Sequence, residues 1–243
     1  MCLTYDFSII VPARDEEQNL PHLFKNILEK RTAFSWNCEL IIVDDHSKDG
    51  TWQIIADIAS KYNWVIGIRL LGKNKGMGAA LIEGTKKARS KVIVWLMADL
   101  SDELDIVNDL TGAVNSGFDL VIASRGLSLR EHGLKGVLSK TYSAACRLFF
   151  GVKARDVTNA FRAFDKRVLE KFGLECQNFA ISPELTLKAH LSGFKIGEIN
   201  TRYKKRMAGK SKFKILFMAW PYGIVFFKLF IAKIAKTVNL KGV

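Results

Sequence analysis

The stretch SKVIVWLMADLSDE, residues 90–103, decides the fold prediction for this chain. Its apolar run VIVWLM ends directly in a small acidic cluster formed by Asp99, Asp102 and Glu103. Sheets of α/β proteins bind ligands beyond the carboxyl ends of their strands, so a buried strand with carboxylates at its tip is suited to hold a divalent cation and a phosphate. Taken alone, the same stretch is read equally well as a polar turn without a ligand.

The residues around this stretch predict alternating strands and helices. Strands are expected over 6–12, 39–45, 64–71, 92–97 and 118–124, and helices over 15–31, 51–62, 79–89 and 103–115. The first of these helices would carry acidic residues in its first turn, where the helix dipole favours them. Five strands alternating with helices over 125 residues are typical of an open, mostly parallel sheet with helices on both faces, which is an α/β fold.

Polar side chains follow four of these strands at the point where each strand ends. They are Glu16, Asp45, Asp99 and Arg125. Because the carboxyl ends of parallel strands meet at one edge of a sheet, these side chains should line a common crevice. The sequence therefore predicts a nucleotide-type site at this edge.

The second half of the chain is less regular. Helices are expected over 134–150, 166–172 and 181–192, and strands over 160–164 and 194–199. No repeat, low-complexity linker or domain break separates these elements from the first half. We therefore predict one domain over residues 1–213, followed by a distinct segment over 214–243.

Composition limits the cellular setting. Hydrophobic residues make up 49% of the 243 residues, enough for a substantial core. The four cysteines have no CxxC spacing and indicate reduced thiols rather than a zinc site or disulfides. The amino terminus has no basic region followed by a long apolar one, so a secretory signal is not expected. The predicted location is the cytoplasm, with peripheral attachment to a membrane.

The attachment is inferred from the position of the charge. The formal net charge is +13, and the last 45 residues contain 11 Lys and Arg and no acidic residue. Within them, 215–227 is uncharged but shorter than the about 20 residues of a membrane span. Lys228, Lys233 and Lys236 fall on one helical face, which suits a helix lying on a membrane surface with anionic lipids. The alternative is a terminal helix packed on the protein's own core.

The acidic strand tip also predicts the type of metal. A nucleotide diphosphate needs a divalent cation to neutralise its charge and that of the leaving group. Asp99 is the best candidate ligand, and Ser101 and Asp102 are possible further oxygen ligands. Oxygen ligands without a nearby His or Cys point to Mg or Mn rather than zinc.

Several blocks in order along the chain carry a resemblance. They are VPARDEEQNL (11–20), ELIIVDDHSKDGT (39–51), NKGMGAALIEGTKKA (74–88), MADLSDE (97–103), VIASR (121–125), RDVTNAFRAF (155–164) and RMAGKSKF (206–213). Together they resemble the family 2 glycosyltransferases of the GT-A fold, most of all the dolichol-phosphate mannose synthase branch. The resemblance covers roughly residues 6–213 and implies a Rossmann-like sheet and a nucleotide-sugar donor.

The resemblance implies which residues bind the donor nucleotide. Pro12 and Glu16 match positions that hold the nucleoside, and Val43 and Asp45 match the strand end that reads the base. Arg14 stands where the family commonly has a tyrosine, so it could add positive charge or contact a different base or sugar. The identity of the donor, GDP-mannose or a UDP-sugar, is therefore left open.

The resemblance also implies the metal site and one departure from it. Ala98 and Asp99 match the last two positions of the Asp-x-Asp metal motif, and Ser101 falls where a further polar ligand sits. The first aspartate of the motif is Met97 here, and a thioether cannot replace a hard oxygen ligand. Either Asp99 holds Mg or Mn with Ser101, Asp102, water and the diphosphate, or metal dependence is weakened.

Three basic residues complete the implied site. Arg125 matches an arginine near the sugar or the acceptor phosphate. Arg206 and Lys212 match residues of a loop that contacts the diphosphate and closes the site. Asp99 and Arg125 are the residues expected to take part in catalysis.

The acceptor is inferred from charge. The polar residues of the second half are mostly cationic, namely Arg125, Arg130, Lys135, Arg155 and Arg162. Arginine pairs bidentately with phosphate, whereas transfer to a hydroxyl needs a general base. Asp156 and Glu184 are the candidate bases if the acceptor is a hydroxyl; otherwise they orient arginines or cap a turn.

These observations predict an inverting glycosyltransferase that moves a hexose from a nucleotide-diphosphate sugar to a polyprenyl phosphate, dolichyl or undecaprenyl. One alternative is transfer to a saccharide or protein hydroxyl. Alternatives of another class are a non-catalytic sugar-nucleotide-binding protein and a basic nucleic-acid-binding protein. A nucleic-acid partner is not expected, because the basic tail is interleaved with apolar residues and no nucleic-acid-binding motif is present.

Overall fold

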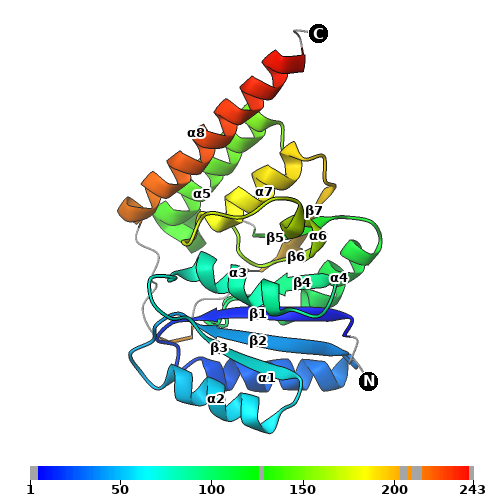
Figure 1. Ribbon diagram of the computed structural model, residues 1–243, viewed down its shortest axis with the longest axis vertical. Helices are drawn as coiled ribbons and strands as arrows, with labels where there is room; N and C mark the ends of the chain where they lie inside the picture. Colours follow the sequence, from blue (N-terminus) through cyan, green and yellow to red (C-terminus); the bar gives the residue numbers. More distant parts are fainter. Residues whose placement is uncertain (1–4, 126–128, 203–206, 209–214, 241–243) are drawn as a thin grey trace.

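The protein is a seven-stranded sheet with helices on both faces (Figure 1). The computed structural model describes residues 5–125, 129–202, 207–208 and 215–240. The strands are β1 Phe7–Ala13, β2 Cys38–Asp44, β3 Val65–Arg69, β4 Val92–Trp95, β5 Leu120–Arg125, β6 Arg162–Asp165 and β7 Ile196–Thr201, in the spatial order β3-β2-β1-β4-β6-β5-β7. Every pairing is parallel except those of β6. The predicted mostly parallel sheet is confirmed.

The central strands are apolar on both sides because both sides are covered. Every residue of β1 and β2 is buried, as expected for parallel strands between two helix layers. Side chains alternate between the layers: Ile9 and Val11 join one core cluster, and Ile10 joins the other.

The helices divide between the two faces. The first cluster is covered by α1 Leu20–Ala33, α2 Thr51–Lys61, the 3₁₀ turn η1 Leu104–Ile106 and α4 Val107–Asn115. The second is covered by α3 Met77–Lys87, α5 Leu129–Phe150, α6 Arg167–Lys171, α7 Ile181–Leu191 and α8 Ile215–Leu240. Figure 1 shows α1 and α2 beneath the sheet and α5, α7 and α8 grouped beyond its other face.

In the first half of the chain, two helices start clearly later than predicted. The first helix begins at Leu20 and not at residue 15, so its first turn contains no acidic residue. Glu16 instead belongs to a turn, because its N–H donates to Thr51 Oγ1 at 2.8 Å and its side chain accepts a hydrogen bond from Asn19. The helix expected from 103 starts as the 3₁₀ turn, and α4 follows only at Val107.

β6 is antiparallel and lies between β4 and β5. Its amino-terminal end therefore meets the carboxyl ends of the other strands. Arg162, the first residue of β6, pairs in register with Trp95 and Ile122. The turn that precedes β6 is thereby brought to the edge where the predicted site lies.

The carboxyl-terminal helix α8 packs on the protein while exposing one apolar face. Val225 and Leu229 are buried in the second core cluster, and Figure 1 shows α8 alongside α5. The opposite face exposes Trp220, Ile224, Phe227, Ile231 and Ile234. Their spacing of three, four and seven residues is that of one helical stripe.

Two of the three lysines that were expected to face lipid contact the protein itself. Lys228 pairs with Glu175, and Lys233 Nζ donates to Phe149 O at 2.7 Å. The side chain of Lys236 lies outside the described residues. Among the helices that the structure describes, none has both the length and the apolar character needed to cross a membrane.

Candidate active site

The tip of β4 holds the carboxylate predicted to bind metal. After β4 the chain reverses at Leu100, whose φ is +62°. This reversal places Ser101 back over Asp99, whose Oδ1 accepts hydrogen bonds from Ser101 N at 3.1 Å and from Ser101 Oγ at 2.6 Å. The two residues predicted as metal ligands therefore lie together, whereas the side chain of Ala98 is buried in the core.

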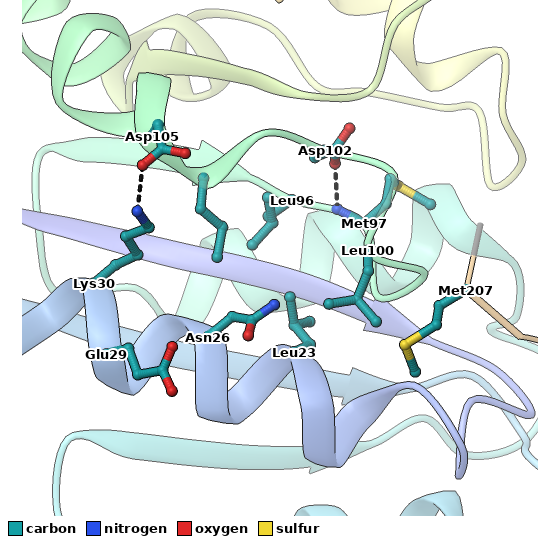
Figure 2. A pocket seen from close by; sticks show the side chains of 11 residues that line it. Leu23, Asn26, Glu29, Lys30, Leu96, Met97, Leu100, Asp102, Asp105 and Met207 are labelled. Atoms are coloured by element: carbon teal, nitrogen blue, oxygen red, sulfur yellow. Dashed lines mark hydrogen bonds and ion pairs between the residues drawn. The ribbon is translucent and has the colours of Figure 1, made fainter. Parts of the chain in front are cut away.

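A second carboxylate folds back onto the same strand tip. Asp102 Oδ2 accepts a hydrogen bond from the N–H of Met97 at 2.8 Å (Figure 2). Burial raises the pKa of Asp102 to about 7; the charge of Asp99 adds to this rise, and the charge of Arg125 opposes it. Asp102 is thus electrostatically coupled to both predicted catalytic residues.

Arg125 ends β5 and is held by a residue from the turn before β6. Its Nε and Nη2 donate to the two carboxylate oxygens of Asp156, at 2.8 and 3.2 Å. Nη2 also donates to Thr158 Oγ1 at 3.2 Å. Burial alone would raise the pKa of Asp156, but the Arg125 charge and hydrogen bonds lower it below its usual range. Asp156 therefore orients the arginine, one of the two roles that the sequence left open.

These groups share one cavity of about 190 Å³. The predicted residues Asp99, Ser101 and Arg125 line it. Sequence reasoning did not assign six other polar residues of the lining, namely Ser139, Thr158, Asn159, Thr201, Arg202 and Tyr222. Ser139 lies on α5 and Tyr222 on α8, so helices far along the chain complete the site. Through Tyr222, the segment that the sequence predicts to be distinct contributes to the wall of the cavity.

The predicted nucleoside end lies at the tips of β1 and β2. Pro12 and Val43 are register partners with buried side chains, so a ligand there would meet their backbone. Asp45 Oδ1 accepts the N–H of Gly76 at 2.7 Å, and its Oδ2 lies 3.4 Å from Arg14 Nη1. The structure thus brings Arg14 and Asp45 together, with the Arg14 side chain 44% exposed.

The basic loop is described at two residues only. Met207 N donates to Asp99 O at 3.3 Å, and Ala208 O accepts from Asn19 Nδ2 at 3.2 Å. Residues 207 and 208 therefore lie between Asp99 and Asn19, whose side chain also donates a hydrogen bond to Glu16. Arg206 and Lys212, the predicted diphosphate contacts, lie outside the described residues and stay predictions.

A larger cavity of about 490 Å³ lies behind the strand tip. It separates α1 from residues 96–105, and Figure 2 shows Leu23, Leu96 and Leu100 on its walls and the Lys30–Asp105 ion pair at one end. Met97 and Asp102 line both cavities, so the acidic segment is the partition between them.

Two of the remaining cationic candidates, Arg155 and Arg162, do not line this cavity. Arg162 is fully buried and donates to Ser182 O and Thr186 Oγ1 at 2.9 and 3.0 Å; burial lowers its pKa to about 9. Arg155 is exposed and pairs with Glu198. Arg162 is therefore a core residue and not an acceptor contact. The side chains of Arg130 and Lys135 lie outside the described residues.

Glu184, the second candidate base, is also engaged in structure. Its carboxylate accepts the backbone N–H groups of Glu175 and Cys176 at 2.9 to 3.2 Å and pairs with Lys188 at 2.7 Å. It therefore caps the turn before α7, which leaves no free general base among the two that the sequence singled out.

The donor set at the strand tip fits Mg or Mn. Within the described residues, no group of three or more His, Cys, Asp or Glu side chains could hold a metal alone. Magnesium is commonly bound by one or two carboxylates together with substrate phosphates. Asp99, Ser101 and Asp102 offer only oxygen, which is the chemistry such a shared site requires.

Known proteins share this sequence and arrangement. A dolichol-phosphate mannosyltransferase from Pyrococcus furiosus is 31% identical over 214 residues, covering 85% of this chain and 59% of that protein. A polyprenol monophosphomannose synthase from Mycolicibacterium smegmatis is 29% identical over 214 residues, covering 84% of this chain and 79% of that protein. An undecaprenyl-phosphate 4-deoxy-4-formamido-L-arabinose transferase from Aeromonas hydrophila is 26% identical over 210 residues, covering 86% and 63%. The chain thus spans about three fifths of the length of the first and third of these relatives.

The fold is also that of solved glycosyltransferases. Glucosyl-3-phosphoglycerate synthase from Mycobacterium tuberculosis, in complex with Mn²⁺, UDP and glucosyl-3-phosphoglycerate, superposes with a TM-score of 0.71 over 94% of this chain and 80% of that chain. Its complex with Mg²⁺ and UDP gives the same score. At 17% identity this likeness shows the GT-A-like fold alone. The family model described as glycosyl transferase family 2 matches residues 8–173, well over half of the chain, so the chain belongs to glycosyl transferase family 2.

Proposed function

We propose that this protein transfers a hexose from a nucleoside-diphosphate sugar to a polyprenyl phosphate. One observation carries the proposal: the acidic tip of β4 and the fixed guanidinium of Arg125 line the same cavity. The acidic tip suits the diphosphate end of the donor through a divalent cation, and a guanidinium suits an acceptor phosphate. Relatives named for polyprenol and undecaprenyl-phosphate substrates support this choice of acceptor.

The reaction is an in-line displacement at the anomeric carbon. An oxygen of the lipid phosphate forms the new bond to this carbon, while its bond to the diphosphate oxygen breaks and the nucleoside diphosphate leaves with the electron pair. The anomeric configuration is therefore inverted. A phosphate acceptor is already ionised near neutral pH and needs positioning rather than deprotonation. This matches a site in which Asp156 orients Arg125 and Glu184 caps a turn.

The protein's own groups divide the work. Asp99 and Ser101 would hold Mg or Mn, which when bound neutralises charge on the leaving diphosphate. Arg125 would bind the acceptor phosphate, with Asp156 and Thr158 fixing the direction of its guanidinium. Arg14, Asp45 and the backbone at the tips of β1 and β2 would receive the nucleoside.

The apolar face of α8 suits a lipid-linked acceptor. The helix α5, which packs against α8, also exposes Leu138 and Leu148. Tyr222 on α8 lines the cavity, so a membrane in contact with α8 would bring acceptor head groups close to the site. We therefore include peripheral membrane attachment through α8, at a cytoplasmic membrane face, in the proposal.

Labelled sugar nucleotides test the proposal directly. GDP-mannose, UDP-glucose and related donors are incubated with Mn²⁺ or Mg²⁺, with and without dolichyl or undecaprenyl phosphate. Label is expected in the organic phase only with the lipid phosphate, and Asp99→Asn should abolish it. Transfer to a saccharide or protein acceptor alone would support the hydroxyl-directed alternative and contradict the proposal.

A further inference from the structure

The position at the very end of the β4 apolar run contributes no oxygen ligand. Met97 carries a thioether, which is a poor ligand for hard cations such as Mg²⁺ and Mn²⁺. Asp99 is therefore the single carboxylate that the strand tip itself offers. One carboxylate and the hydroxyl of Ser101 would leave most of the cation's charge to be balanced by the diphosphate.

The carboxylate of Asp102 lies against the backbone of Met97. The turn through Leu100 brings its carboxylate back over the strand, where Oδ2 accepts the Met97 N–H at 2.8 Å. Figure 2 shows the other carboxylate oxygen directed away from Met97. One oxygen thus fixes the side chain to the strand, and the second can face a ligand.

We propose that Asp102 supplies the second carboxylate of the divalent-cation site, in place of one that residue 97 does not provide. Asp99, Ser101 and Asp102 line the same cavity of about 190 Å³, which Arg125 also lines. Two carboxylates plus substrate phosphates form a common set for Mg²⁺. The inference rests on the proposed function, because the cation belongs to the sugar-nucleotide reaction.

A purely structural role for Asp102 is the competing explanation, and it makes a different prediction. An asparagine at this position still accepts the N–H of Met97 through its amide oxygen, so the turn can persist. It lacks the negative charge that a cation needs. Asp102→Asn therefore separates the hydrogen bond from the ligand role.

Binding of Mn²⁺ is measured by the fall of the free-ion EPR signal during titration with MnCl₂, first with protein alone and then with GDP or UDP, corrected for ion bound to nucleotide. Asp102→Asn is expected to weaken Mn²⁺ binding about tenfold or more, the scale seen when groups around a metal are removed. Asp105→Asn is the matched control, since it removes the same charge three residues along the chain, in η1, where Asp105 pairs with Lys30 in the other cavity. It should bind Mn²⁺ like the wild type.

A second-site change tests the location. Met97→Asp in the Asp102→Asn background places a carboxylate on the strand and is expected to restore most of the lost Mn²⁺ affinity. Wild-type affinity in Asp102→Asn, equal loss in Asp105→Asn, or no recovery in the double variant would each overturn the inference. Failure of the proposed function is distinct, because it would show as wild-type protein that binds Mn²⁺ and nucleotide but transfers no sugar to lipid phosphate.

Discussion

Arg125, which lines the candidate site, forms a two-point ion pair with Asp156, with Nε–Oδ2 and Nη2–Oδ1 distances of 2.8 and 3.2 Å. The Asp156 side chain is 1% exposed and that of Arg125 21%. The pair joins the end of β5 to the turn before β6, two segments about thirty residues apart that meet because β6 inserts antiparallel beside β5. Its planar geometry holds the guanidinium in one orientation.

Asp156→Asn should destabilise the protein in a pH-dependent way. Removing one partner of a buried pair costs about 3–5 kcal/mol. The folded-state pKa of Asp156 lies below its usual value, so its stabilisation is present above the unfolded pKa of about 3.9 and is lost as pH falls through the folded pKa. Urea unfolding at pH 7, 4 and 3 should show the gap to wild type shrinking with acid. The exposed pair partner Asp57 provides the control variant Asp57→Asn; a gap that stays constant for Asp156→Asn would contradict this assignment.

Arg125→Lys should separate charge from geometry. Lysine keeps the positive charge but cannot make two parallel hydrogen bonds. A lost hydrogen bond to a charged group is worth about 1.5–3 kcal/mol, so kcat/KM for sugar transfer should fall about 10- to 100-fold. Arg155→Lys, at an exposed arginine that pairs with Glu198 away from the cavity, should leave kcat/KM unchanged. An equal fall of kcat/KM in both variants would contradict the assignment of Arg125 to the active site.

Arg162→Met should reduce stability and leave acceptor binding in the folded fraction unchanged. Arg162 is fully buried, and its loss would strand the oxygens of Ser182 and Thr186 that accept its hydrogen bonds. The expected loss is about 3–5 kcal/mol in the free energy of unfolding at pH 7. The exposed Arg155→Met should cost less than about 1 kcal/mol. A stable Arg162→Met protein with a raised KM for lipid phosphate would instead restore Arg162 as an acceptor contact.

The first half of the fold could be predicted from local patterns because its strands and helices alternate regularly. Apolar runs such as residues 40–43 end in polar residues, and parallel pairing then brings those ends together. Asp99 and Ser101 lie close together because only one residue separates them in the sequence. The polar residues at the strand ends predict the edge of the sheet where the site lies. The roles of individual residues come from the family resemblance.

The second half depends on long-range pairing that no local pattern reveals. The short strand β6 shows only as an apolar segment in the sequence. Its antiparallel direction depends on its pairing with β4 and β5 on either side. From sequence, Arg162 is expected to be a surface cation. It can be buried only because Ser182 and Thr186 of α7, distant in sequence, accept its hydrogen bonds. Tyr222 reads as part of an apolar tail, and only the packing of α8 against α5 and α7 turns it toward the cavity.

Gly78→Ala should destabilise the contact between the two halves. A Cβ at Gly78 would lie 2.1 Å from Cys176 O, and the Gly78 N–H donates to Gln177 O at 2.9 Å. Backbone cannot move aside as a side chain can, so the cost should be about 1–3 kcal/mol or more. Gly112→Ala is the matched control: it also lies in a helix but meets nothing within 4 Å, and it should stabilise by up to about 1 kcal/mol. Thermal unfolding of both variants gives the comparison, and equal shifts would contradict it.

The apolar face of α8 should be needed for membrane attachment and not for folding. Phe227 and Ile231 are 64% and 67% exposed, whereas Val225 and Leu229 on the same helix are buried. Burial of one such side chain in lipid is worth about 1.5–3 kcal/mol, so Phe227→Asp or Ile231→Asp should weaken co-sedimentation with vesicles about tenfold or more. Leu71→Asp, at a residue after β3 that is 77% exposed, should bind vesicles like the wild type. All three variants should keep wild-type thermal stability, since none of these side chains is buried in the core.

Vesicle binding that survives both α8 substitutions would place the lipid contact elsewhere, whereas unfolding of the α8 variants would mean that this face packs against protein.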